Sequence, residues 1–407
     1  MIAPRSRLPH FLTALYALLI VHASLQPFTG WLAPAPGTPF FLWGPWPRFN
    51  PPDVLINLIA YMPLGLAATW TGGRQTPVGR AAIRAIAACA LLSLAMETAQ
   101  MFLPVRRAST IDLLTNVVGG AIGAGIAAFL MRRPDWRQAL RRWREAMFLG
   151  GVLGDFGLTL VVIWWVMHVN PAIVLFAATF QPDAAVATDP ATVLLEAAQT
   201  GLNFLGVLLF VALLMRRREH FGLVAIGFIL ATLALKMGAS LVMLKPASYD
   251  HWLRPGAGIG LAGGALTLLA AVWLPQRLRI VVCAVALLSS PLAAVLMPDL
   301  LSAAPALSHF GWNYGHLLNF NGLTRTVLLV WPVLAALHLL LLFGRRNGGP
   351  CGGCRRRTGG GQTRPDAGCT STPGSRDRSG PGRIIAPFPR APVAHELLPP
   401  SRLLLPQ

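Results

Sequence analysis

The stretch DLLTNVVGGAIGAGIAAFLM at residues 112–131 decides the fold class. It opens on the carboxylate of Asp112 and the amide of Asn116, one helical turn apart, and every residue after Asn116 is small or apolar. A run of about 20 such residues is the length that an α-helix needs to cross the hydrocarbon core of a bilayer. The segment DVLINLIAYMPLG repeats the pattern with Asp53 and Asn57. The sequence therefore predicts two membrane-spanning helices that each open on an acid–amide pair.

The composition extends this prediction to most of the chain. Of its 407 residues, 54% are hydrophobic and 12% are charged, about half the charged fraction of a typical soluble domain. Apolar runs of spanning length recur, and they predict an all-α polytopic membrane protein with about ten transmembrane helices. The expected spans are 10–27, 53–70, 80–102, 111–131, 146–168, 191–215, 220–244, 256–274, 278–297 and 322–343.

The positions of the basic residues predict the orientation of these helices. Cytoplasmic loops carry the excess of arginine and lysine in membrane proteins. With both termini in the cytoplasm, the inner segments hold Arg5, Arg7, Arg74, Arg80, Arg132, Arg133, Arg137, Arg141, Arg142, Arg144, Arg216, Arg217, Arg218, Arg277, Arg279, Arg345 and Arg346, and the outer segments hold Arg48, Arg106, Arg107, Lys245 and Arg254. The net charge of +19 therefore follows from membrane topology, and we expect no nucleic-acid partner.

The order of these segments predicts four parts of the chain. They are a four-helix membrane domain at 10–131, a basic cytoplasmic linker at 132–145, a second membrane domain of about six helices at 146–345 and a disordered tail at 346–407. The tail is rich in glycine, proline and arginine and has no apolar period. We expect the first apolar run to remain as a helix and not to be a cleaved signal peptide. No cysteine pair falls in an outer loop, so we predict no structural disulfide.

The predicted topology brings polar residues of four segments to one outer level of the first domain. This candidate cluster consists of Asp53, Asn57, Glu97, Gln100, Arg106, Arg107, Ser109, Asp112 and Asn116. A carboxylate within the membrane normally faces a partner or a cavity, so we expect Glu97 to pair with Arg106 or Arg107, or to bind a proton. A structural interpretation stays open, in which the aspartates cap helix N-termini and the amides join helices.

The order and spacing of these residues resemble the VanZ-like family. The resemblance covers about residues 10–131 and rests on Asp53-x3-Asn57-x5-Pro63-x-Gly65, Glu97-x2-Gln100 and Arg107-x-Ser-x2-Asp112-x3-Asn116-x2-Gly119-x3-Gly123. The namesake of the family is linked to low-level teicoplanin resistance. The resemblance therefore implies a protein of the bacterial cytoplasmic membrane that acts in the cell envelope and in tolerance to glycopeptide or lipoglycopeptide antibiotics. It supplies no reaction.

The second membrane domain has polar residues of its own. Glu196 opens a helix together with Gln199 and Asn203 on one face, and Lys236 lies at a matching depth in the next helix. We expect Glu196 and Lys236 to form a buried pair. We expect Asp155 to be isolated near the middle of the membrane, where it either binds a proton or makes a helix–helix hydrogen bond. His309 and His316 have no nearby carboxylate or cysteine, so we predict no metal site and no cofactor.

Three functions are compatible with the sequence. The first is a non-enzymatic envelope protein whose outer cluster engages a membrane lipid, a lipid-linked envelope precursor or an amphiphilic drug. The second is an enzyme acting on a lipid or lipid-linked substrate. In it, Glu97 or Asp112 would be the general base and Arg107 would bind a phosphate of the substrate. The third is a secondary transporter, for which the two halves show no matching repeat. The first is favoured because no catalytic motif accompanies the cluster.

Overall fold

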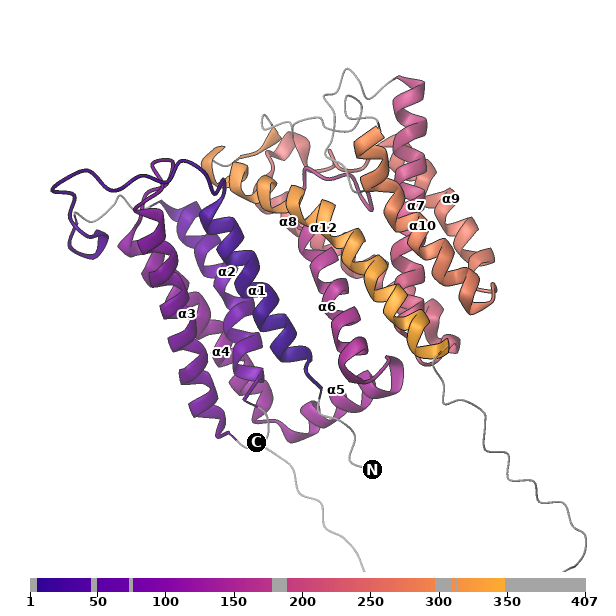
Figure 1. The fold of residues 1–407 in the computed structure, drawn as a ribbon, viewed down its shortest axis with the longest axis horizontal. Helices are drawn as coiled ribbons and strands as arrows, with labels where there is room; N and C mark the ends of the chain where they lie inside the picture. The colour runs from indigo at the N-terminus through magenta and orange to yellow at the C-terminus, as the bar shows by residue number, and fades with distance from the viewer. Residues whose placement is uncertain are drawn as a thin grey trace, which may run out of the picture. The chain divides into compact units, whose positions relative to one another are not determined.

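The computed structural model describes residues 6–44, 50–72, 76–177, 189–296, 309–311 and 314–347. These residues form helices and no β-strand, which confirms the predicted all-α polytopic class (Figure 1). The predictions for Arg5, Arg48 and Arg74, and for the tail beyond Asn347 with its three cysteines, lie outside the described residues.

Within the described ranges, nine helices are long and apolar enough to cross a membrane. They are α1 (Leu8–Leu25), α2 (Pro51–Trp70), α3 (Val78–Gln100), α4 (Thr110–Met131), α6 (Gly151–His168), α7 (Pro190–Leu214), α8 (Phe221–Met243), α10 (Gln276–Leu296) and α12 (Tyr314–Asn347). The remaining predicted span corresponds to α9 (Pro255–Ala271), an apolar helix of 17 residues that is shorter than these.

The segment predicted as a basic linker contains a helix that the sequence reading did not identify. This helix, α5 (Pro134–Met147), is amphipathic, and none of its residues is buried. It runs across the ends of the upright helices in Figure 1 and joins α4 to α6. Because α5 extends to Met147, α6 begins at Gly151, later than the predicted start at residue 146.

Glycines set the spacing of α2 and α4. A Cβ added to Gly119 would collide with the carbonyl group of Leu58, and one added to Gly123 would collide with that of Met62. Gly123 lies four residues after Gly119 on α4, and Met62 lies four residues after Leu58 on α2. The contacts therefore advance in the same chain direction on both helices, so α2 and α4 run parallel. Small residues let two helix backbones approach this closely. Such close packing drives helix association in membranes, because lipid tails are as apolar as the helix surface and the hydrophobic effect does not favour helix–helix contact. The helices that open on Asp53 and Asp112 therefore begin at the same end.

The second half of the protein is built around α7, which is buried along most of its length. Glycines again allow close packing, because a Cβ on Gly260 of α9 would collide with the carbonyl of Ala197 on α7. After α6, residues 170–177 are buried and non-helical. Irregular backbone at membrane depth is tolerated where protein encloses it.

Helix α1 contacts both halves of the protein. The rings of Phe11 and Phe156 pack edge to face at 6.1 Å, and a His22 ring nitrogen lies 3.0 Å from the Thr326 hydroxyl. Residues Met1–Cys351 form one compact unit. The boundary predicted after residue 131 is therefore bridged by α1.

Candidate functional site

Glu97 lies at the end of a buried stripe on α3. Its members are spaced four residues apart and comprise Ala81, Ala85, Cys89, Ser93 and Glu97. The Glu97 side chain is only 3% exposed, and its carboxylate accepts a hydrogen bond from the backbone N–H of Ser109 at 2.8 Å. The expected ion pair is not formed, because neither Arg106 nor Arg107 is within ion-pair distance of Glu97 in the described structure. Glu97 instead ties the α3–α4 loop to α3.

Ser109 joins this anchor to the start of α4. It is the N-cap of α4, and its hydroxyl accepts a hydrogen bond from the backbone N–H of Asp112 at 3.3 Å. Asp112 lies in the first turn, where a carboxylate is stabilised by the positive end of the helix dipole. Asp112 and Arg106 are near enough to Glu97 to act on it electrostatically. The residue that caps α4 is therefore Ser109 and not an aspartate, while Asp112 lies where the helix dipole favours an acid.

The two adjacent arginines have different environments. Arg106 donates a hydrogen bond through Nη2 to the carbonyl oxygen of Ala23 at 2.6 Å. Burial lowers the pKa of the Arg106 guanidinium, and Glu97 opposes this shift. Gln100 makes a similar bond to the carbonyl of Ser24 at 3.1 Å. Both side chains thus hold the end of α1, whereas Arg107 is exposed and has no hydrogen bond to a described residue.

Asn116 lies deeper in the bundle and is buried. Its side-chain amide donates to the hydroxyl of Ser93 at 2.9 Å, which joins α4 to α3. The buried hydroxyl of Tyr61 on α2 lies beside Ser93 and Glu97. The sequence reading did not select Ser93 or Tyr61. The four-residue spacing from Ser93 to Glu97 was the signal that would have placed Ser93 on the same face.

Two further members of the cluster come from α2. Asp53 accepts a hydrogen bond from the Asn50 side chain at 2.7 Å and is half-buried. Asn57 is half-buried as well. Because α2 and α4 are parallel, both residues lie at the end where α4 starts.

The predicted cluster thus separates into two groups at one end of α2–α4. The first group consists of Glu97, Gln100, Arg106, Ser109 and Asn116, whose hydrogen bonds join α1, α3 and α4. The second consists of Asp53, Asn57, Arg107 and Asp112, of which Arg107 is exposed and the other three are half-buried, as are Gln100, Arg106 and Ser109 of the first group. We call the second group the accessible polar layer. It combines a guanidinium, two carboxyl groups and an amide, the functional groups that bind phosphate and ammonium ions.

The comparison with known families concerns this part of the chain. Residues 8–131 match the family model described as VanZ/LLP1. The match runs from the first residue of α1 to the last residue of α4, so the predicted family resemblance is confirmed over the four helices that carry the site. No curated protein and no solved structure matches the chain.

The structure corrects the pairing predicted for the second half. Glu196 forms an ion pair with Arg254, with 3.0 Å between Nε and Oε2, and its other oxygen accepts from the backbone N–H of Ala257 at 3.2 Å. Lys236 donates to the carbonyl oxygen of Asn170 at 2.6 Å instead. The prediction rested on equal depth along the two helices, which leaves the rotation of each helix open. The close packing of α9 on α7 brings Arg254 to Glu196.

Asp155 is neither isolated nor near the middle of its helix. It lies in the second turn of α6, where it is bound by the Arg144 guanidinium, the Ser6 hydroxyl at 3.0 Å and the backbone N–H of Arg7 at 2.6 Å. The prediction placed it too deep because it started this helix five residues early. Asp155 therefore joins α5 and the segment before α1 to α6.

Proposed function

We propose that this chain is a VanZ-like protein of the bacterial cytoplasmic membrane that raises tolerance to glycopeptide or lipoglycopeptide antibiotics. In this proposal the accessible polar layer faces the outer leaflet and binds the headgroup of a membrane lipid, a lipid-linked envelope precursor or the amphiphilic drug itself. The observation that carries the proposal is the exposed guanidinium of Arg107 at the same end of the helices as Asp53 and Asp112, above residues whose hydrogen bonds join α1, α3 and α4. The match to VanZ/LLP1 over α1–α4 supports the envelope role.

The chemistry of the layer suits a headgroup that carries both signs of charge. The guanidinium of Arg107 is exposed, and arginine is well suited to bind a phosphate through two parallel hydrogen bonds. Asp53 and Asp112 supply negative charge at the same end of the helices, where an ammonium group of the ligand would be stabilised. The support below holds these residues in place, since Glu97 fixes the loop that carries Arg107.

The test is antibiotic susceptibility in a sensitive Gram-positive host. Wild type, Arg107→Ala and the control Arg80→Ala are expressed at matched membrane levels and challenged with teicoplanin and a lipoglycopeptide. Arg80 is exposed near the opposite end of α3, so its loss removes the same charge without touching the layer. We expect wild type and Arg80→Ala to raise tolerance and Arg107→Ala to lose the effect. No tolerance from well-expressed wild type, or equal loss in both variants, would overturn the proposal.

One observation favours a transport role for the second half as the other candidate. Lys236 is fully buried and is held by the non-helical segment that follows α6. Transporters place binding groups of this kind beside irregular backbone within the membrane. The corresponding test is gradient-dependent solute uptake by proteoliposomes, comparing wild type with Lys236→Met. Uptake that is independent of a gradient or of Lys236 excludes this function.

A further inference from the structure

Helix α5 carries an apolar face that the described residues leave largely exposed. We call Trp136, Ala139, Leu140 and Trp143 the α5 apolar face; they recur at the spacing of one side of a helix. Trp136 is 70% exposed, Leu140 52% and Trp143 50%. Large apolar side chains gathered on one exposed surface mark a site of interaction.

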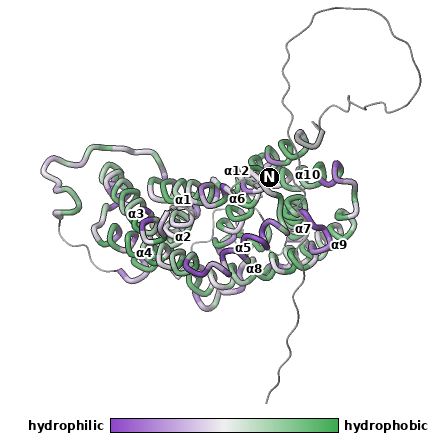
Figure 2. Tube along the Cα trace, turned by 90° about the horizontal axis from the view of Figure 1, so that it is seen from below, coloured by the Kyte–Doolittle hydropathy of each residue, from purple (hydrophilic) through white to green (hydrophobic). Residues whose placement is uncertain are grey.

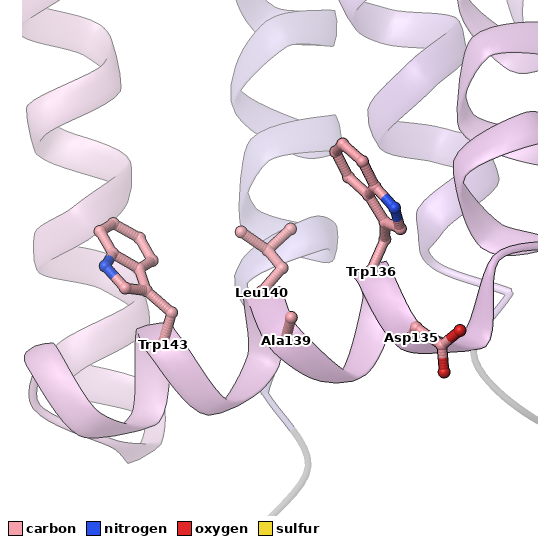
Figure 3. Close-up of a pocket in the computed structure, with 5 residues that line it drawn as sticks. All are labelled: Asp135, Trp136, Ala139, Leu140 and Trp143. Carbon is pink, nitrogen blue, oxygen red and sulfur yellow. The ribbon is translucent and has the colours of Figure 1, made fainter.

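The position of α5 indicates what lies against this face. It connects the spanning helices α4 and α6, so it lies where the two helices leave the membrane. The Glu97 cluster lies at the start of α4 and α5 follows its end, which puts α5 at the opposite membrane surface. Trp136, Leu140 and Trp143 all point from α5 toward the spanning helices, as Figure 3 shows. Together with Asp135 and Ala139, they border an open space of about 510 Å³ whose lining belongs to α5 alone.

The rest of α5 and its approach are strongly basic. Residues 132–145 contain Arg132, Arg133, Arg137, Arg141, Arg142 and Arg144 against the two acids Asp135 and Glu145. The helix forms a hydrophilic band in Figure 2 between apolar helices. Arg141 and Arg142 are exposed, and the contact of Arg141 with Glu145 is long at 3.6 Å. Basic residues beside an apolar face are complementary to anionic lipid headgroups above acyl chains.

The C-terminal end of α5 is held in place by its neighbours, so the α5 apolar face is presented in a fixed position. Arg144 is bound to buried Asp155. The backbone N–H of Arg216 donates to the carbonyl of Met147 at 2.8 Å. The ring of Trp143 packs edge to face on Phe148 at 5.6 Å. A helix that is already held in place loses less freedom when a ligand binds to it.

We propose that α5 is an interfacial helix that binds an anionic phospholipid in the leaflet opposite the accessible polar layer. An acyl chain lies against the α5 apolar face, and the lipid phosphate contacts Arg141 and Arg142. The lipid is the occupant because the face opens toward the hydrocarbon at the end of two spanning helices. This site is separate from the Glu97 cluster and does not depend on the proposed tolerance function.

The test is lipid retention by the purified full-length protein, measured by native mass spectrometry in detergent supplemented with phosphatidylglycerol or phosphatidylcholine. Wild type is compared with Arg141→Ala/Arg142→Ala and with Trp136→Ala. The matched control is Arg80→Ala/Arg84→Ala, which removes two exposed arginines at the same membrane surface on α3. Thermal unfolding of each variant reports whether the fold is retained, and Trp136→Ala is mild because that side chain packs little against the protein.

We expect wild type and the α3 control to retain phosphatidylglycerol in preference to phosphatidylcholine. The double substitution Arg141→Ala/Arg142→Ala should weaken retention of phosphatidylglycerol by about 25-fold, since each basic residue near an anionic surface contributes about fivefold. Trp136→Ala should weaken retention of both lipids. No preference for the anionic lipid in wild type, or equal losses in the α3 and α5 pairs, would overturn the proposal. So would a dimer mass that disappears in Trp136→Ala, because a second copy would then cover the face.

Discussion

Glu97 of α3 accepts a hydrogen bond from the backbone N–H of Ser109, 2.8 Å away at the start of α4. One buried carboxylate therefore fixes the loop that presents Arg107 and the cap that starts α4. This makes Glu97 a positioning residue, which separates its role from that of Arg107. The distinction can be measured because two substitutions of Glu97 affect the bond differently.

Glu97→Gln keeps an oxygen that can accept the Ser109 N–H, whereas Glu97→Ala removes it. Losing the partner of a buried donor costs about 1–3 kcal/mol. We therefore expect Glu97→Ala to lower the thermal unfolding midpoint of detergent-purified protein and Glu97→Gln to stay close to wild type. Equal destabilisation by the two substitutions would show that the charge of Glu97, and not its acceptor oxygen, holds the loop.

The two neighbouring arginines give a second contrast. Arg106→Ala removes the bond to the Ala23 carbonyl, and a hydrogen bond from a charged group contributes about 1.5–3 kcal/mol. Arg107→Ala removes an exposed side chain, where changes normally stay within about 0.5 kcal/mol. Thermal unfolding should therefore separate the variants, with Arg106→Ala the less stable. The opposite order would remove Arg107 from the accessible polar layer.

Much of the fold could be predicted from the sequence because hydrophobic length and loop charge are local signals. Helix α5 was missed because its arginines dominated the composition of 132–145 and hid the spacing of Trp136, Leu140 and Trp143. The prediction of Lys236 as the partner of Glu196 was wrong, because the depth of a residue along a helix does not fix the rotation of that helix or which helix lies beside it. That partner, Arg254, was assigned to an outer loop, and only the tight packing of α9 on α7 reveals the contact.

The glycines of α4 provide a test of the packing that aligns the site. Gly123→Leu should disrupt the contact with α2, because even a Cβ at this position would collide with the Met62 carbonyl. Overpacking costs about 1–3 kcal/mol or more. Gly125→Leu is the matched control, since nothing lies within 4 Å of a Cβ there. Limited proteolysis and thermal unfolding should show damage in Gly123→Leu alone, and similar damage in both would contradict the parallel α2–α4 contact.

The ion pair of Arg144 and Asp155 should make a large contribution to holding α5. The two side chains are 14% and 1% exposed, and removing one partner of a buried pair costs about 3–5 kcal/mol. We expect Arg144→Ala to destabilise the protein and to raise the proteolytic sensitivity of α5. Arg142→Ala on the same helix is the control and should do neither. A double-mutant cycle with Asp155→Asn that gives no coupling energy would show that the pair does not stabilise the helix.

The lowered pKa of His251 predicts that the stability of the protein depends on pH. It lies in the loop between α8 and α9, where its ring stacks on that of His309 at 3.8 Å. Burial, followed by the nearby His309 and Arg254, lowers the pKa of His251 to about 4, and Asp250 opposes the shift. The unfolded chain, with a histidine pKa of about 6.5, therefore binds more protons between these values. Stability contributed by neutral His251 is present above pH of about 6.5 and is lost as the pH falls toward about 4.

The measurement is the thermal unfolding midpoint of wild type and His251→Gln across this pH window. We expect the midpoint of wild type to fall more steeply than that of the variant, because glutamine does not titrate. Parallel curves for wild type and His251→Gln would show that His251 is protonated equally in the folded and unfolded states.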